Sequence, residues 1–191
     1  WSAVAERNRI NMMSSKEISL ISLVILLGVL LLGGCASSPD PEDVVKNGSL
    51  EINPAVKIGE ALGNYPYFGE KTWVHYRDAQ ERLIVEFKGI IDLYKFRGCE
   101  RDGVLLTPEM VYRAARRMRD VNLTYIARFV VSEDGKKFSL KSSSINMDSL
   151  KKETGKKQFQ KIFDEDYLIL QNIYANQPEP STWEMLYSAG G

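Results

Sequence analysis

The sequence is poor in residues that form covalent cross-links or bind metals. Its 191 residues include two cysteines and one histidine. Two cysteines cannot build a network of disulfides. His75 has no cysteine or carboxylate at the spacing of metal ligands, so we expect a structural or exposed histidine and no metal site.

Charge of one sign is not in excess either. The chain has 25 basic and 25 acidic residues, and the part from residue 35 onward has 22 and 23. Proteins that bind nucleic acid usually have a strong basic excess. The composition therefore argues against a nucleic-acid partner.

Known catalytic motifs are missing as well. The sequence contains no G-x-S-x-G, H-E-x-x-H, P-loop or C-x-x-C pattern. Its carboxylates, among them Glu81 and Glu86, are scattered and do not suggest a pair of catalytic acids. We expect a protein that is not an enzyme and has no cofactor.

No hydrophobic run reaches the roughly 20 residues of a membrane-spanning helix. The longest, Ile18–Leu32, has 15 residues and follows the positive charge of Lys16. This length and flank are typical of the apolar region of a secretory signal peptide.

The sequence that closes this run resembles a bacterial lipobox. Leu32, Gly33 and Gly34 precede Cys35, and another small residue, Ala36, follows it. The resemblance implies recognition of Leu32–Gly34 by signal peptidase, cleavage before Cys35, and lipid on the Cys35 sulfur. The alternative is an uncleaved N-terminal anchor. With Cys35 lipidated, Cys99 has no intramolecular partner, and we expect it to be a buried apolar residue rather than a reactive thiol.

These features divide the N-terminal part of the chain. Residues 1–11 are interpreted as an upstream extension, 12–34 as the signal peptide, and the small, polar, proline-containing stretch 35–49 as a flexible tether. In bacteria with two membranes, aspartate after the lipidated cysteine favours the inner membrane. Because Ala36 stands there, resemblance favours the periplasmic face of the outer membrane.

The remainder predicts a single α+β domain over 50–175 and a C-terminal tail over 176–191. Capping residues and apolar spacing indicate helices at 54–62 and 108–120. Alternating segments indicate two hairpins, 71–77 with 82–89, and 123–132 with a return strand through Phe138 and Leu140. Asp134-Gly135 is the preferred chemistry of a two-residue turn.

Two hairpins and two or three helices predict a four-stranded antiparallel sheet with the helices on one face. Lys151–Lys161 is interpreted as a solvated linker or helix face, with a patch that binds anionic lipid as the alternative. The apolar stretch Tyr167–Tyr174 is expected to dock on the domain's own sheet, with a partner surface as the alternative.

Three segments carry a broader resemblance: Val56–Tyr65 (VKIGEALGNY), Lys71–Tyr76 (KTWVHY) and Leu83–Phe87 (LIVEF). They resemble small bacterial envelope lipoproteins of uncharacterised function. The order of short helix, Leu-Gly, Trp-x-x-Tyr strand and apolar strand is also similar to the BamE/SmpA-like lipoproteins, whose domain resembles half of β-lactamase inhibitor protein. The resemblance implies no functional residue beyond the lipobox cysteine.

Two functions follow from these patterns. The first is a non-enzymatic envelope lipoprotein that binds or scaffolds another envelope protein in the periplasm. The alternative is a ligand-binding or hydrolytic lipoprotein with a pocket between sheet and helices. Arg113, Arg116 and Arg117, on the helix expected at 108–120, could contact an anion or a lipid headgroup, although a solvated helix face is the simpler interpretation.

Overall fold

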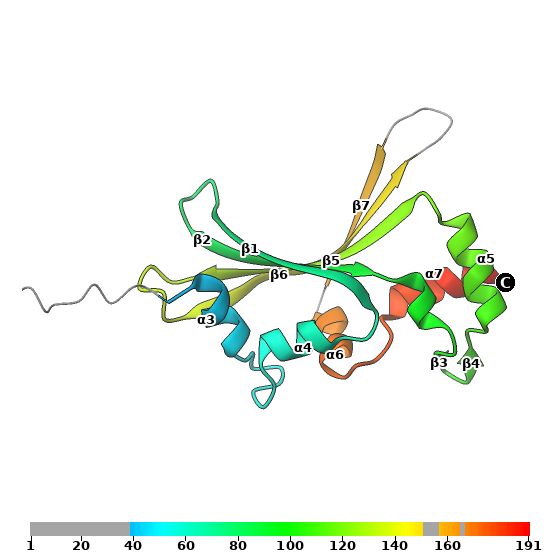
Figure 1. Ribbon diagram of the computed structural model, residues 1–191, viewed down its shortest axis with the longest axis horizontal. Coiled ribbons are helices and arrows are strands. Elements are labelled where there is room, and N and C mark those ends of the chain that lie inside the picture. The colour runs from blue at the N-terminus through cyan, green and yellow to red at the C-terminus, as the bar shows by residue number, and fades with distance from the viewer. Residues whose placement is uncertain (1–38, 151–156, 165–166) are drawn as a thin grey trace, which may run out of the picture. The chain divides into compact units, whose positions relative to one another are not determined.

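The computed structural model describes residues 39–150, 157–164 and 167–191, which form an α+β fold (Figure 1). The described residues contain a five-stranded antiparallel sheet, a two-stranded sheet, five α-helices and one short 3₁₀ helix. The helices are α3 (Pro41–Asn47), α4 (Ile58–Asn64), α5 (Pro108–Arg117), α6 (Leu168–Tyr174), α7 (Pro180–Gly190) and the 3₁₀ helix η2 (Leu93–Phe96). The strands are β1 (Phe68–Arg77), β2 (Leu83–Ile91), β3 (Glu100–Arg101), β4 (Val104–Leu105), β5 (Val121–Val131), β6 (Phe138–Leu150) and β7 (Lys157–Phe163).

The main sheet has the order β1-β2-β5-β6-β7, with every neighbouring pair antiparallel. Both predicted hairpins are present. β1 pairs with β2 from Arg77 opposite Leu83 onward, and β5 pairs with β6 from Val131 opposite Phe138. Alternation of apolar and polar residues fixes this register, because a shift by one residue would move every core side chain to the other face.

Helices α3, α4 and α6 lie on one face of the main sheet (Figure 1). Aromatic residues from the strands fill the space beneath them: Phe68 lies 5.6 Å from Phe87 and from Tyr125, measured between ring centroids. Burying such rings removes 150–250 Å² of surface each and dominates the stability of a core this size.

A second packing unit lies at one end of the sheet, where α7 packs along α5 and both adjoin η2 (Figure 1). Thr107 begins α5 as predicted, since its side chain accepts a hydrogen bond from the Met110 N–H at 3.2 Å. Trp183 and Leu186 of α7 are buried there. The segment expected to be a C-terminal tail is therefore part of the core, because its apolar side chains cover the inner face of α5.

The sheet has one strand more than predicted. Part of the basic segment Lys151–Lys161 forms β7, which pairs with β6 from Ser144 to Leu150. The prediction of a solvated linker or helix face is wrong for 157–161. The segment becomes a strand because its main chain hydrogen-bonds to the edge of β6, and these bonds do not depend on the polar side chains of its sequence.

The expected tether is also shorter than predicted. The chain is helical from Pro41 in α3, and Val45 is fully buried. Asp40 caps this helix by accepting a hydrogen bond from the Glu42 N–H at 2.9 Å. An N-cap followed by proline is a helix start, and it places the beginning of the fold about ten residues before residue 50.

Two local predictions need correction. The helix expected at 54–62 begins at Ile58, while Asn53 is held by an isolated bridge to Leu50. The β5–β6 connection is a four-residue loop closed by the Ser132 N–H bond to the Lys137 carbonyl at 2.8 Å. Within it Gly135 has a φ of +66°, whereas Asp134 does not have a positive φ and instead accepts a hydrogen bond from the Lys136 N–H.

The segment Tyr167–Tyr174 docks on the domain itself, as expected. Ile169, Leu170 and Ile173 of α6 are buried, and the helix contacts α4 and β6. None of the helices in the described part of the chain has the length and apolar character needed to cross a membrane.

Candidate functional site

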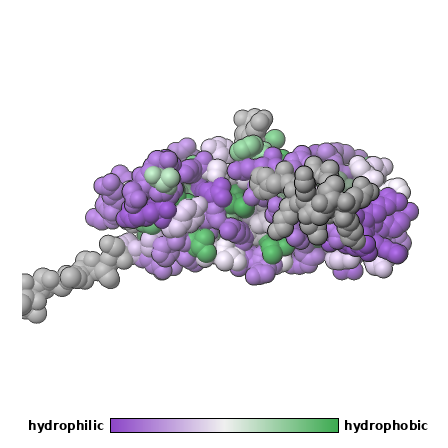
Figure 2. All heavy atoms as spheres, turned by 90° about the horizontal axis from the view of Figure 1, so that it is seen from above, coloured by the Kyte–Doolittle hydropathy of each residue, from purple (hydrophilic) through white to green (hydrophobic). Residues whose placement is uncertain are grey.

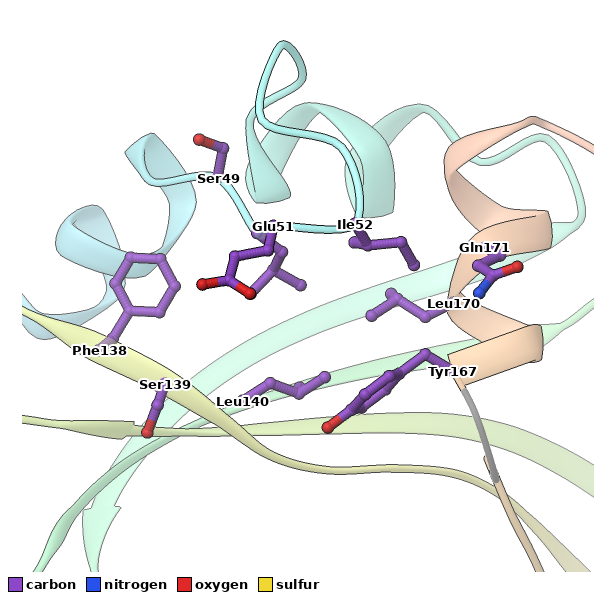
Figure 3. A pocket seen from close by; sticks show the side chains of 10 residues that line it. Ser49, Glu51, Ile52, Phe138, Ser139, Leu140, Tyr167, Leu170 and Gln171 are labelled. Atoms are coloured by element: carbon purple, nitrogen blue, oxygen red, sulfur yellow. The ribbon is translucent and has the colours of Figure 1, made fainter.

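A cleft of about 630 Å³ lies between the loop after α3, the first residues of β6 and the start of α6 (Figure 3). This volume falls within the range of small-ligand pockets. Its lining is mostly apolar and includes residues from three separate parts of the chain: Ser49, Leu50, Glu51, Ile52, Phe138, Ser139, Leu140, Tyr167, Leu170 and Gln171.

Local interactions hold the walls of this cleft in place. Asp164 accepts hydrogen bonds from the N–H groups of Ile169 at 2.6 Å and Leu170 at 3.0 Å, and so fixes the start of α6. The same carboxylate accepts a hydrogen bond from the Ser143 hydroxyl at 2.6 Å, which ties α6 to β6. At the end of this wall Tyr167 has a φ of +57°, a conformation uncommon for aromatic residues.

The floor of the cleft reaches the edge of strand β6. Phe138 and Leu140 point to the core face of the sheet, and Ser139 points to the other face, because side chains alternate along a strand. All three line the cleft. A cavity lined by both kinds of residue follows the edge of the strand, and Figure 3 shows the three side chains below the 49–52 loop.

Over its first residues, this edge of β6 has no neighbouring strand among the residues that the structure describes. β7 pairs with β6 only from Ser144 to Leu150, and the Ser143 carbonyl accepts a hydrogen bond from the Asp164 N–H at 3.1 Å. Between Phe138 and Ser142, β5 is the only strand that pairs with β6 in the described part of the chain. An unpaired strand edge presents a row of backbone donors and acceptors.

The residues that line the cleft are better suited to binding a ligand than to catalysis. Glu51 is the one ionisable carboxylate among the ten lining residues, and the set contains no histidine or cysteine. A general base must itself lie within hydrogen-bond reach of the proton that it abstracts. Leu140, which is half-buried, and Tyr167, which is exposed, instead offer apolar surface to a bound group. Sequence analysis allowed for a pocket between sheet and helices as an alternative but named none of these residues, because only the fold brings together the three segments that line the cleft.

The opposite face of the sheet carries a polar network centred on Glu86, which is 4 % exposed. Its carboxylate bonds with Arg128 on β5, with Lys88 at 3.0 Å, and with the Tyr76 hydroxyl at 3.3 Å. Burial alone would raise the pKa of Glu86, but the hydrogen bonds from Lys88 and Arg128 outweigh it and place the pKa below its usual value. The face of the molecule that Figure 2 shows is largely hydrophilic, with scattered apolar spots.

The predicted anion-contact residues Arg113, Arg116 and Arg117 all lie on α5, as expected. With Arg119 and Asp120 they border a shallow depression of about 540 Å³. Arg117 is engaged by a hydrogen bond to the Ala189 carbonyl of α7, while Arg113 and Arg116 are exposed. The geometry brings the arginines together at the end of the sheet that carries α5 and α7 (Figure 1).

The histidine and the second cysteine lie elsewhere. His75 is exposed on β1, and its Nδ1 lies 3.3 Å from a Glu42 carboxylate oxygen of α3. Cys99 is half-buried, and its thiol donates to the Tyr67 hydroxyl at 3.2 Å. No cluster of three potential metal ligands occurs among residues 39–150, 157–164 and 167–191.

The lipobox residues Leu32, Gly33, Gly34 and Cys35 lie outside the described residues. Comparisons of the chain with protein families, with characterised proteins and with solved structures found no significant match.

Proposed function

We propose that this protein is a bacterial envelope lipoprotein, anchored by lipid on Cys35, that binds another envelope protein and has no catalytic activity of its own. The observation that carries the proposal is the order of Lys16, the 15-residue apolar run and Leu-Gly-Gly-Cys. Together these three parts fit the steps of lipoprotein export, namely targeting, insertion, cleavage and lipid attachment. A BamE/SmpA-like relationship remains part of this proposal.

The domain would sit close to the membrane surface. Its first described residue, Pro39, is four residues after Cys35, and an extended chain of four residues spans at most ~14 Å. Pro39 adjoins Gly135 in the β5–β6 loop, so this end of the sheet would face the lipid. The arginines of α5 lie near the other end (Figure 1), which favours an anionic partner in the periplasm over headgroups of the anchoring membrane.

The alternative is a lipoprotein that binds a small ligand in the cleft between the sheet, α6 and the 49–52 loop. The volume and apolar lining of the cleft favour this reading over a hydrolytic one, since a hydrolase would need a second acid or a base beside Glu51. Binding of one defined small molecule with a matching loss in a cleft-blocked variant would support it.

Metabolic labelling with a radioactive fatty acid tests the anchor. We expect label on the wild-type protein, no label on Cys35→Ser, and full label on the matched control Cys99→Ser. Label that persists on Cys35→Ser would contradict the proposal. Fractionation of the two membranes tests the location: wild type should be in the outer membrane, and Ala36→Asp should move it to the inner membrane.

A further inference from the structure

The open edge of β6 and the cleft beside it form one continuous surface. Between Phe138 and Ser142, where β7 does not extend, the main-chain groups on this edge pair with no strand in the described part of the chain. The cleft offers apolar surface immediately beside this edge, from the half-buried Leu140 and the exposed ring of Tyr167. A strand added to an exposed sheet edge gains affinity from main-chain hydrogen bonds and specificity from pockets that take alternate side chains. Both components are present here.

The charges along the edge describe the partner. Ser139 points away from the core face, on the side opposite Phe138 and Leu140, and Lys137 is exposed in the loop just before β6. Lys141 follows on the same stretch and is paired with Asp78. The segment from Gly135 to Met147 contains three lysines and no acidic residue. A partner strand would therefore carry apolar residues on its cleft side and acidic residues, at alternate positions, on its lysine side.

The same charges disfavour a second copy of this chain. Two β6 edges related by a twofold axis would bring Lys137 and Lys141 of one copy beside the same lysines of the other. Like charges opposite each other on paired strands are destabilising, and lysines on an edge are a common means of preventing self-association.

We propose that the β6 edge, with the adjoining cleft, binds an extended segment of a partner protein that alternates apolar and acidic residues and adds a strand to the sheet. This inference deepens the proposed binding function and names its surface and the chemistry of its partner. It does not depend on lipid at Cys35, so failure of the labelling experiment and failure of this one are distinguishable.

The test uses the full chain in detergent micelles and a fluorescent, end-blocked peptide of four Val-Glu repeats, with binding followed by anisotropy. Two further peptides carry N-methyl groups on all valines or on all glutamates. In an extended strand the N–H groups of alternate residues point to the same edge, so one methylation series should weaken binding about tenfold and the other should leave it unchanged. Equal binding of both methylated peptides would overturn strand addition and leave only apolar contact.

Variants locate the site on the protein. Ser49→Trp places a large ring at the mouth of the cleft and should abolish binding, whereas Ser188→Trp, an equally exposed serine on α7, should not. Lys137→Glu should weaken binding more at low salt than at high salt, while Lys71→Glu, with the same charge change on exposed strand β1, which is not a neighbour of β6, should have no effect. Melting temperatures show that each variant is folded. No binding of the unmethylated peptide, or equal binding by Ser49→Trp and Ser188→Trp, would refute the proposal.

Discussion

The loop between β5 and β6 offers a quantitative test of the fold. Gly135 has a φ of +66°, and a Cβ built there would lie 3.9 Å from Pro39, with no closer neighbour among the described residues. The Cβ itself meets no clash, so we expect backbone strain to dominate the cost of Gly135→Val. A left-handed conformation costs an L-residue roughly 1–2 kcal/mol, and β-branching places valine at the upper end.

A substitution of glycine also restricts the unfolded chain, which stabilises the fold by about 0.4–1 kcal/mol. We therefore expect Gly135→Val to lower the free energy of unfolding by about 1 kcal/mol. With a urea dependence of roughly 1–3 kcal/mol per molar, the unfolding midpoint should fall by about 0.5 M.

Two variants serve as controls. Gly135→Asn should lose less, because asparagine tolerates this conformation. Gly63→Val lies in α4, where a Cβ has open space and φ is not positive, so it lacks the strain of Gly135→Val. The reasoning is refuted if Gly135→Val and Gly135→Asn have the same urea midpoint as the wild-type protein.

Other substitutions test separate parts of the molecule. Glu86→Gln should destabilise the protein at pH 7. Because the pKa of Glu86 is lowered in the folded state, the difference in unfolding free energy between wild type and Glu86→Gln should shrink as the pH falls below about 4.3. A difference that stays constant down to pH 3 would argue against the network around Glu86. Gly89→Ala should cost about 1–3 kcal/mol, since a Cβ there would lie 2.8 Å from the buried Phe68 ring, and an unchanged midpoint would mean that the ring is free to move. Trp183→Ala should cost about 3–5 kcal/mol in the same assay, whereas a C-terminal tail outside the core would give no change. His75→Ala should alter the free energy of unfolding by less than about 1 kcal/mol, because the contact of His75 with Glu42 is an exposed pair. The variant should also complement a deletion strain. Loss of complementation at a normal protein level would contradict the non-enzymatic proposal.

Helix α5 and the two hairpins were predictable from local signals. Thr107 with Pro108 begins the helix, and the alternation in β5 places Tyr125, Ala127 and Phe129 on the core face. Such signals act over a few residues, through capping bonds and side-chain alternation, and do not require knowledge of the rest of the chain.

The fifth strand was not predictable in this way. β7 contains Lys157–Phe163, which lacks a regular apolar alternation, and its strand conformation comes from pairing with β6. Similarly, α7 is only weakly marked in sequence, yet α5 provides a surface on which Trp183 is buried. For β7, pairing with a neighbouring strand outweighs the intrinsic β-propensity of its residues, because that propensity mainly measures how well a residue fits its neighbours.

The sequence by itself determined the α+β class, the two hairpins, the start of α5 and the expectation of a lipidated Cys35, because each depends on residues adjacent along the chain. Tertiary structure alone decided the fifth strand, the docking of α7 and the cleft between Ser49, Leu140 and Leu170. The cleft needs three distant segments to meet, and its open edge exists because β7 ends opposite Ser144 while β6 begins six residues earlier, at Phe138. Such a difference in strand length is set by pairing in three dimensions, and no local pattern of residues encodes it.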